Sequence, residues 1–275
     1  MQIINNKESL SEILKEYKSI GNKISLIPTM GNLHRGHQEL FSSAPDRTIK
    51  ITTIYINPLQ FNNSDDYDSY PRTLNHDLEI CKKNNINIVY APDGDISNEI
   101  DIEKNIDLPK FTRYLCGQSR EDHFCGVYKI VKHLFKIINP DYACFGKKDY
   151  QQLLLIKYIA STYFPNLKII EVDTVRINNI ALSSRLKRLS DESLREVKII
   201  YDVLLNLRHQ IVDGKKFDNV KEDAIKDIES HDIYVEYLEH RNNETLELAN
   251  GQLDNSTIFI AYKMGDIRLI DNVQI

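Results

Sequence analysis

The chain has 275 residues, which is enough for one large domain or two smaller ones. It is 41% hydrophobic and 27% charged, with 10 Gly and 8 Pro, and this composition excludes collagen-like, low-complexity and wholly disordered chains. Its 35 Lys and Arg against 40 Asp and Glu give a net charge of −5, so no overall positive field exists to hold nucleic acid. Any anion site must therefore be local.

The N-terminal segment MQIINNKESLSEILKEYK mixes charged with apolar positions and lacks the apolar core of a signal peptide. No apolar run is long enough to span a bilayer, so we expect a cytoplasmic protein with no membrane partner. The cysteines show neither CxxC spacing nor a disulfide-rich pattern, which favours reduced thiols packed as small hydrophobic groups over a zinc site. They are Cys81, Cys116, Cys125 and Cys144.

The first two thirds of the chain alternate between strand and helix patterns. Ser9 and Glu12 have the spacing of a capping box, and the amphipathic helix that they open ends at Gly21. Beyond it, the predicted strands are 24–27, 49–56, 86–91, 142–145 and 167–172, and the predicted helices are 33–41, 73–84, 127–138 and 150–162. Near-continuously apolar strands between helices indicate a parallel sheet covered on both faces.

The pattern changes after about residue 174. Ser190 is predicted to cap a long helix over 191–210, and a second helix covers 219–229. The β-branched runs at 234–238, 256–263 and 267–270 predict antiparallel strands, with a hairpin turn at 264–266. We therefore predict an α/β fold: a Rossmann-like doubly wound parallel sheet over residues 1–174, and a smaller C-terminal α+β lid domain over 175–275.

The most distinctive local pattern is PTMGNLHRGH at residues 28–37, where the first strand of this alternation gives way to its helix. His34 and His37 share one face at the positive end of that helix, where backbone N–H groups attract phosphate and a histidine can add a donor. Gly36 leaves room for a ligand to approach the backbone. Alternatively, these are ordinary surface or core histidines. A metal site is disfavoured because no Glu follows the first histidine as in HExxH.

A second pattern, FGKKDYQQ at residues 145–152, also follows an apolar strand and opens a helix. Lysine beside a helix N-terminus is unfavourable for the helix dipole, but a bound polyphosphate reverses that penalty. The alternative is a solvated basic turn.

Three further segments carry weaker signals. Hydroxyls and a guanidinium at 182–185 can close over phosphates, and the amides of NPLQF at 57–61 follow the second strand. Arg120 and His123 precede a helix and could add positive charge there. The alternatives are an ordinary loop, an Asn-Pro turn and a buried Arg paired with Asp. Because the carboxyl ends of parallel strands meet in one crevice, we expect these segments to converge.

These residues resemble the pantoate–β-alanine ligase family of the HxGH nucleotidyltransferase-like group. The resemblance runs over about residues 24–190 through PTMGNLHRGH, NPLQF, YPRTLNHDLE, SREDHFCGV, PDYACFGKKDYQQL and TVRINNIALSSR, in the family's order. HxGH alone is typical of the whole group, whereas the combination is specific to the family. The C-terminal part contributes few motifs.

The resemblance implies a two-step, magnesium-dependent reaction. The carboxylate of pantoate attacks the α-phosphorus of ATP, which yields pantoyl adenylate and pyrophosphate, and the amine of β-alanine then displaces AMP to form pantothenate. The implied partners are these small molecules and a second copy of the chain in a homodimer, with no nucleic acid. Mg²⁺ is the implied cofactor.

The resemblance also implies roles for single residues. His34, His37 and Lys148 are the catalytic residues, with His37 as the proton donor. Gln60 and Gln152 hold pantoate, with Gln60 also serving β-alanine. The pocket is further lined by Asn57, Tyr70 and Arg120, and magnesium lies at Asp77. The ATP contacts come from Met30, Gly31, Asn32, Leu33, His34, Arg35, Gly36, His37, Gly146, Lys147, Lys148, Asp149, Val175, Leu182, Ser183, Ser184 and Arg185.

Several positions depart from the family pattern. His76 stands where an acid is usual, and Lys147 replaces a usual Glu. Glu121 and Asp122 replace a usual Pro-Gly pair, the stretch 176–183 is one residue short and lacks a usual Gly, and Leu182 replaces a usual Met. None of these changes removes a group that the reaction requires.

Two other functions stay open at this stage. The first is a different adenylyl or cytidylyl transferase of the same fold, with a phosphorylated acceptor. Gln60 and Gln152 favour a small hydroxy acid over that acceptor because neither brings charge. The second is a nucleotide-binding regulatory module without turnover, which intact catalytic residues disfavour.

Overall fold

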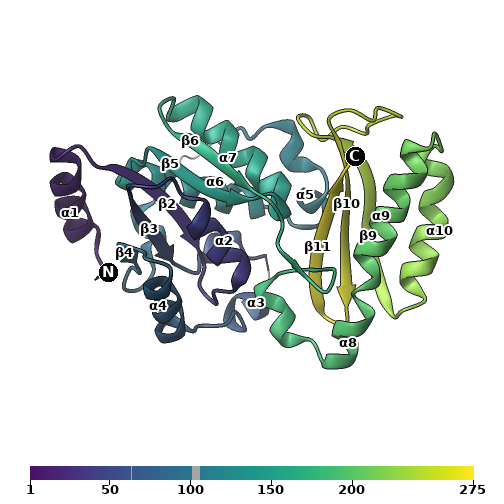
Figure 1. The fold of residues 1–275 in the computed structure, drawn as a ribbon, viewed down its shortest axis with the longest axis horizontal. Coiled ribbons are helices and arrows are strands. Elements are labelled where there is room, and N and C mark those ends of the chain that lie inside the picture. The colour runs from purple at the N-terminus through teal and green to yellow at the C-terminus, as the bar shows by residue number, and fades with distance from the viewer. Residues whose placement is uncertain (63, 101–105) are drawn as a thin grey trace. The chain divides into compact units, whose positions relative to one another are not determined.

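A computed structural model describes residues 1–62, 64–100 and 106–275, and they form two compact units. The first unit comprises Met1–Pro109 and Gly117–Asp173, and the second comprises Lys110–Cys116 and Thr174–Ile275 (Figure 1). Among the described residues, no helix combines the length and the apolar character that crossing a membrane requires.

The first unit is built on a six-stranded sheet in the order β1-β4-β3-β2-β5-β6. Every neighbouring pair in it is parallel, which confirms the predicted Rossmann-like α/β fold (Figure 1). The strands are β1 (Gln2–Ile4), β2 (Lys23–Thr29), β3 (Thr48–Ile54), β4 (Ile88–Tyr90), β5 (Tyr142–Gly146) and β6 (Lys168–Val172).

Seven α-helices accompany this sheet in the described part of the chain up to residue 173. They are α1 (Lys7–Ser19), α2 (Arg35–Ser43), α3 (Ser64–Asp68), α4 (Leu74–Lys83), α5 (Cys116–Ser119), α6 (His123–Ile138) and α7 (Tyr150–Tyr163). Phe41 of α2 and Cys81 of α4 are fully buried in one core with Ile27 of β2. Because central strands of a parallel sheet are covered on both faces, β2 and β4 carry near-continuous apolar runs.

The beginning of the chain differs from the sequence prediction in two ways. The cap of α1 is Asn6, whose side chain accepts a hydrogen bond from the Ser9 N–H at 2.9 Å. The predicted capping box at Ser9 is therefore wrong, because Ser9 already lies inside the helix. The strand β1 was not predicted, since it is a three-residue edge strand in which Ile3 stays 51% exposed.

The second unit packs helices against an antiparallel sheet, as the α+β prediction for this part of the chain requires. Its strands β9 (Ile233–Asn242), β10 (Ser256–Met264) and β11 (Ile267–Gln274) lie in the order β11-β10-β9. The predicted hairpin at 264–266 is confirmed, because Met264 pairs with Ile267 across a two-residue turn. A small hairpin of β7 (Arg176–Ile177) and β8 (Ile180–Ala181) precedes the helices.

The helices of this unit are α8 (Asp191–Glu196), α9 (Ile199–Val212) and α10 (Phe217–Glu229). Ser190 caps α8 as predicted, through the Ser193 N–H. The prediction of a single helix over 191–210 is wrong, because the helix is interrupted between Glu196, the end of α8, and Ile199, the start of α9. Val197, at this break, is 1% exposed and belongs to the apolar core of the unit, so the interruption buries a side chain.

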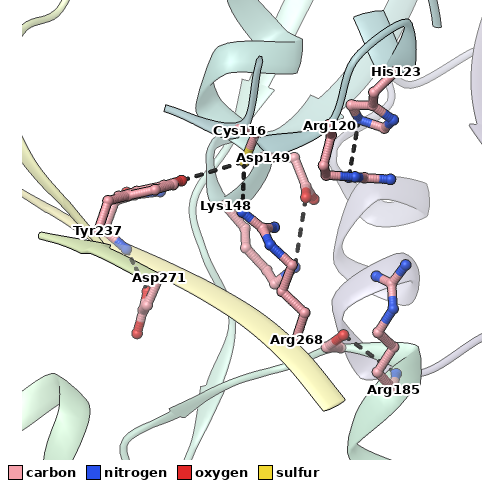
Figure 2. Close-up of polar contacts among 11 residues, drawn as sticks. Cys116, Arg120, His123, Lys148, Asp149, Arg185, Tyr237, Arg268 and Asp271 are labelled. Carbon is pink, nitrogen blue, oxygen red and sulfur yellow. Dashed lines mark hydrogen bonds and ion pairs between the residues drawn. The ribbon is translucent and has the colours of Figure 1, made fainter. Parts of the chain in front are cut away.

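The segment Lys110–Cys116 belongs to the second unit although it lies within the range 1–174 that the sequence analysis assigned to the first domain. Its contacts explain the difference. The guanidinium of Arg241 lies 4.8 Å from the centre of the Tyr114 ring, and the thiol of Cys116 lies 3.2 Å from the Tyr237 hydroxyl (Figure 2). No local sequence pattern marks such contacts, because their partners are more than a hundred residues away.

Candidate active site

The order of the strands selects one place in the first unit for a ligand. The chain passes from β2 to β3 on one side, whereas β5 pairs with β2 on the other side. In open α/β sheets, ligands bind beyond the carboxyl ends of the strands where the strand order reverses in this way. The segments that leave β2, β3 and β5 there carry the histidines, Gln60 and Lys148.

The two histidines build the beginning of α2. His34 is the cap of that helix, and its Nδ1 accepts a hydrogen bond from the Gly36 N–H at 3.1 Å. Nδ1 of His37 accepts from the His34 N–H at 3.2 Å, and the two ring centres are 4.1 Å apart. Since both Nδ1 atoms accept, the neutral rings carry their protons on Nε2, which makes Nε2 the donor nitrogen of each ring. The predicted helix start at residue 33 therefore moves to Arg35.

Lys148 lies in a short 3-10 helix, Lys147–Asp149, between β5 and α7. Its side chain is 18% exposed, and its amine lies 3.6 Å from the Asp149 carboxylate. Desolvation lowers the pKa of His37 well below its usual value, and its electrostatic interactions with His34 and Lys148 lower that pKa further. The three predicted catalytic side chains thus act on one another electrostatically within the first unit.

The neighbouring lysine has a different orientation. The amine of Lys147 lies 2.7 Å from the Asp173 carboxylate. The departure from the family pattern at this position therefore places its positive charge beside an acid of the chain. Lys148 is the lysine whose charge reaches His37.

Gln60 is held by a small amide network after β3. Its Nε2 lies 3.0 Å from the sulfur of Met30, and its Oε1 accepts from Asn57 Nδ2 at 3.2 Å. Asn57 is 1% exposed, and the same Nδ2 also donates to the Gly126 carbonyl at 3.1 Å. The structure therefore brings Asn57 and Gln60 together, and the Asn57 amide nitrogen bonds to groups of the protein itself.

Arg120 and His123 lie next to each other (Figure 2), and both bond to the backbone carbonyl of Gln60. His123 Nδ1 lies 2.8 Å from the Gln60 carbonyl oxygen, which can only accept, so this nitrogen carries the proton. Nε2 of His123 faces Arg120 Nη1 at 3.2 Å and accepts from it, while Nη2 donates to the same carbonyl at 3.3 Å. The expectation that His123 adds positive charge is therefore wrong, because this geometry requires the neutral ring.

Sequence reasoning missed Gly126, which permits this arrangement. A Cβ atom on Gly126 would lie 2.0 Å from the Leu59 carbonyl oxygen and 2.7 Å from the Gln60 nitrogen. Helix α6 thus packs directly on the turn at Pro58–Gln60. A lone glycine inside a strongly apolar helical pattern is the signal that could have marked this contact.

Two other residues that the sequence analysis assigned to the pocket are Tyr70 and Gln152. Tyr70 is 7% exposed, and its ring meets the Phe61 ring edge-on at 5.7 Å. Gln152 lies in the first turn of α7, one turn after Lys148, and is partly buried. Their contacts with pantoate stay predictions.

The surroundings of Asp77 do not fit a magnesium ligand. This residue is 0% exposed, and its carboxylate accepts hydrogen bonds from the backbone of Asn32 and Leu33. Within residues 1–62, 64–100 and 106–275, no group of three or more His, Cys, Asp or Glu side chains could hold a metal ion. The magnesium that the resemblance implies therefore has no protein-held site at Asp77.

The remaining predicted ATP contacts belong to the second unit. The Leu182 N–H donates to the Val175 carbonyl at 3.0 Å, and Ser183 caps the short helix Ser184–Arg188 through the Arg185 N–H. Between β7 and β8, Asn178 and Asn179 have φ values of 51° and 66°. Asparagine tolerates these left-handed angles, so a tight two-residue turn explains how this stretch is shorter than usual and lacks glycine. The contacts of this segment with ATP stay predictions.

A parallel sheet with an HxGH helix start and a lysine beside it is the framework of a nucleotide-binding α/β enzyme. The family model described as pantoate-beta-alanine ligase matches residues 2–274. The chain therefore belongs to the pantoate-beta-alanine ligase family.

Individual relatives cover the chain almost completely. It is 36% identical to a pantothenate synthetase of Neisseria meningitidis serogroup B, over 100% of this chain and 99% of that protein. A pantothenate synthetase structure from Thermus thermophilus is 28% identical, with a TM-score of 0.87 and coverage of 100% and 99%. A pantoate-beta-alanine ligase from Francisella tularensis, solved with beta-gamma ATP and beta-alanine, is 31% identical, with a TM-score of 0.84 and coverage of 100% and 97%.

Proposed function

We propose that this chain joins pantoate to β-alanine in an ATP-dependent reaction that forms pantothenate. Membership of the pantoate-beta-alanine ligase family supports this function across nearly the whole chain. A structural relative that was solved with beta-gamma ATP and beta-alanine supports ATP and β-alanine as two of the substrates.

The reaction has two balanced steps. First, a carboxylate oxygen of pantoate forms a bond to the α-phosphorus of ATP, and the bond from that phosphorus to the β-phosphate oxygen breaks to release pyrophosphate. Second, the β-alanine amine forms a bond to the acyl carbon of pantoyl adenylate, the acyl–oxygen bond to AMP breaks, and the amine loses its proton. Both steps depend on positioning and on stabilisation of developing negative charge.

The geometry of the first unit suits these needs. Nε2–H of His34 and of His37 can donate to phosphate oxygens, because their Nδ1 atoms are occupied by backbone N–H groups. The lowered pKa of His37 favours the neutral ring, which donates a hydrogen bond to phosphate through Nε2–H. Lys148 supplies the fixed positive charge for the leaving pyrophosphate.

The roles of the two glutamines follow from their chemistry. Gln60 is fixed on three sides by Asn57, Met30 and the Arg120–His123 pair that holds its carbonyl. Such an amide can orient the hydroxyl and carboxylate groups of a small acid without adding charge. We assign Gln60 and Gln152 to pantoate, and Gln60 also to β-alanine.

The single observation that carries the proposal is the electrostatic convergence of His34, His37 and Lys148 at the carboxyl end of the sheet. The alternative of a nucleotidyl transferase with a phosphorylated acceptor uses the same three groups, so the acceptor must be tested directly. A regulatory module would bind ATP without turnover.

The decisive experiment follows AMP and pyrophosphate release from ATP with pantoate, with β-alanine, with both and with neither. Pyrophosphate release that needs pantoate, together with sustained AMP release that needs both acids, supports the ligase. Release without either acid, or nucleotide binding with no release under any condition, contradicts it.

Three further features of the protein are part of the proposal. The chain acts in the cytoplasm, requires Mg²⁺ with ATP, and forms a homodimer. Light scattering on the purified protein tests the last point: a mass near twice that of the 32.0 kDa chain is expected, and a monomer at all concentrations contradicts it.

A further inference from the structure

The carboxylate of Asp77 is committed to the loop that precedes the histidines. Asp77 lies in the first turn of α4, and its Oδ2 accepts from the Asn32 N–H at 2.9 Å while its Oδ1 accepts from the Leu33 N–H at 2.7 Å. The Thr73 hydroxyl donates to Oδ2 at 3.0 Å. Thr73 is the cap residue of α4, but its side chain makes no capping hydrogen bond to that helix.

The backbone that this carboxylate holds has an uncommon conformation. Gly31 and Asn32 have φ values of 85° and 49°, so two successive residues are left-handed. This turn directs neighbouring N–H groups toward one anion, as anion-binding backbone concavities do. A Cβ atom on Gly31 would lie 3.1 Å from Asp77 Oδ2, so the carboxylate fits closely under the turn.

The held loop leads directly into the catalytic helix start. His34 follows Leu33 immediately, and the His34 N–H donates to His37 Nδ1. A displacement of Leu33 would therefore move His34 and break the contact that sets the ring of His37. The chain thus links Asp77 to both imidazoles through backbone alone.

The same contacts exclude a cation from this carboxylate. Mg²⁺ requires near-octahedral oxygen ligands at about 2.0–2.1 Å and keeps most of its water. Asp77 is fully buried, and three donor hydrogens face its two oxygens where a cation would bind. An ionised carboxylate at a helix N-terminus with several N–H donors is satisfied without a metal.

We propose that Asp77 is a positioning residue, which locks the loop before α2 so that His34 and His37 present their Nε2–H groups to the phosphates, and that it is not a magnesium ligand. The phosphate contacts of the histidines rest on the proposed function. The effect of Asp77 on the two rings does not, because it follows from hydrogen bonds within the chain.

The first test compares Asp77→Asn with Glu79→Gln, a matched control that removes the same charge from the exposed side of the same helix. An asparagine amide cannot accept all three hydrogen bonds, and misplacement of catalytic groups costs about tenfold to a hundredfold in rate. We expect such a fall in single-turnover adenylate formation for Asp77→Asn and a change within about twofold for Glu79→Gln. A rate within twofold of the parent for Asp77→Asn overturns the proposal.

The second measurement separates positioning from metal binding. It records adenylate formation by Asp77→Asn over a range of Mg²⁺ concentrations at saturating ATP. The half-maximal Mg²⁺ concentration should match that of the parent chain. A rise of about tenfold, with the rate restored at high Mg²⁺, identifies Asp77 as a metal ligand and overturns the proposal.

The third measurement needs no activity. In nitrogen-15 spectra of the parent chain, His34 and His37 should both show the Nε2–H tautomer with Nδ1 as acceptor. Asp77→Asn should alter these signals, and Glu79→Gln should leave them unchanged. If the parent chain forms no adenylate, the proposed function fails while these spectra still decide the role of Asp77.

A milder variant covers the case in which Asp77→Asn does not fold. Thr73→Val removes one of the three donors and leaves both backbone hydrogen bonds to Asp77. It should shift the imidazole signals and slow adenylate formation a few-fold at an unchanged Mg²⁺ requirement. Unaltered imidazole signals in a folded Thr73→Val chain contradict the proposal.

Discussion

The two units differ in what some of their buried polar side chains hold in place. In the first unit, Asp77 and Asn57 are almost fully buried; Asp77 bonds to the loop before α2, and Asn57 joins the turn after β3 to the Gly126 carbonyl of α6. In the second unit, buried groups such as His240 and Thr257 bond to the adjacent strand or its turn, to Ser256 and Asn243. Buried polar groups therefore join neighbouring strands in both units, as the Thr52 hydroxyl does on the Ile27 carbonyl, and in the first unit they also hold the segments of the candidate site.

This difference predicts which mutations affect chemistry and which affect only stability. Where α6 meets the turn at Pro58–Gln60, the backbones are packed so closely that even one added methyl group is disruptive. In the second unit, a cluster of twenty buried apolar residues supplies the stability. Four experiments can break or sharpen the contrast.

The largest effect is expected from Gly126→Ala. The added Cβ would meet the Leu59 carbonyl carbon at 2.3 Å and the oxygen at 2.0 Å, so α6 and the Gln60 turn must separate. We expect the free energy of unfolding to fall by more than about 3 kcal/mol, with weaker pantoate binding. Calorimetry and the pantoate KM measure these changes.

The control for that experiment is Gly146→Ala, because no atom of the described part of the chain, apart from its chain neighbours, lies within 4 Å of a Cβ at Gly146. It should change the free energy of unfolding by less than about 1 kcal/mol. Equal destabilisation by both variants would show that the contact between α6 and the Gln60 turn is not critical.

Leu204→Ala tests the core of the second unit. Leu204 is 0% exposed on α9, and loss of a buried leucine side chain costs about 2–5 kcal/mol. Val212→Ala on the same helix removes a side chain that is 54% exposed and should cost less than about 1 kcal/mol. If calorimetry shows a loss below about 1 kcal/mol for Leu204→Ala, the second unit does not depend on its apolar core.

His133 in the first unit and His240 in the second are both buried histidines with lowered pKa. Burial, followed by the charges of Lys7 and Lys136, lowers the pKa of His133 to about 4 from the usual 6.5, and its Nε2 has no hydrogen-bond partner among the residues that the structure describes. Burial also lowers the pKa of His240, but its Nε2 lies 2.8 Å from the Ser256 hydroxyl.

The pH dependence of stability follows from these directions. Between pH 6.5 and 4, His133 binds a proton in the unfolded chain but stays unprotonated in the folded chain. The free energy of unfolding therefore falls as the pH drops through this window. We expect a contribution of roughly 1 to 3 kcal/mol, which His133→Leu should remove. Urea titrations at pH 7 and pH 4 measure it. An equal pH dependence in the parent and the variant would contradict the assignment.

The smallest change in free energy is expected from Lys148→Ala, and it is specific to chemistry. Removing the amine should slow adenylate formation at least about tenfold, which corresponds to about 1.4 kcal/mol, without lowering the melting temperature. The pKa of His37 should rise, because Lys148 is one of the charges that lower it. Rapid-quench assays and histidine NMR titrations check both effects. A normal adenylation rate, or an unchanged His37 pKa, would remove Lys148 from the site.

Sequence reasoning reached the parts of the fold that depend on local pattern. The alternation of strands and helices predicts the parallel sheet, and the PTMGNLHRGH and FGKKDYQQ segments place His37 and Lys148 at adjacent strand ends. Both results follow because apolar periodicity and topology determine where strands end.

The misses have a common physical cause. Asp77 bonds to Leu33 across 44 positions, and Gly126 supports a turn more than sixty residues earlier, so nothing local in the sequence marks either contact. The interruption between α8 and α9 buries Val197 in the apolar core of the second unit. Tertiary packing therefore overrides a local sequence pattern that is typical of one continuous helix.

The chain crosses between the units three times, after Pro109, after Cys116 and after Asp173. A proteolytic fragment cut at residue 174 would therefore carry Tyr114 without the Arg241 that covers its ring, and the complementary fragment would lack a piece of its own interior. The second unit is therefore incomplete in the C-terminal fragment, which should regain its native structure only when the fragment that carries Lys110–Cys116 is added.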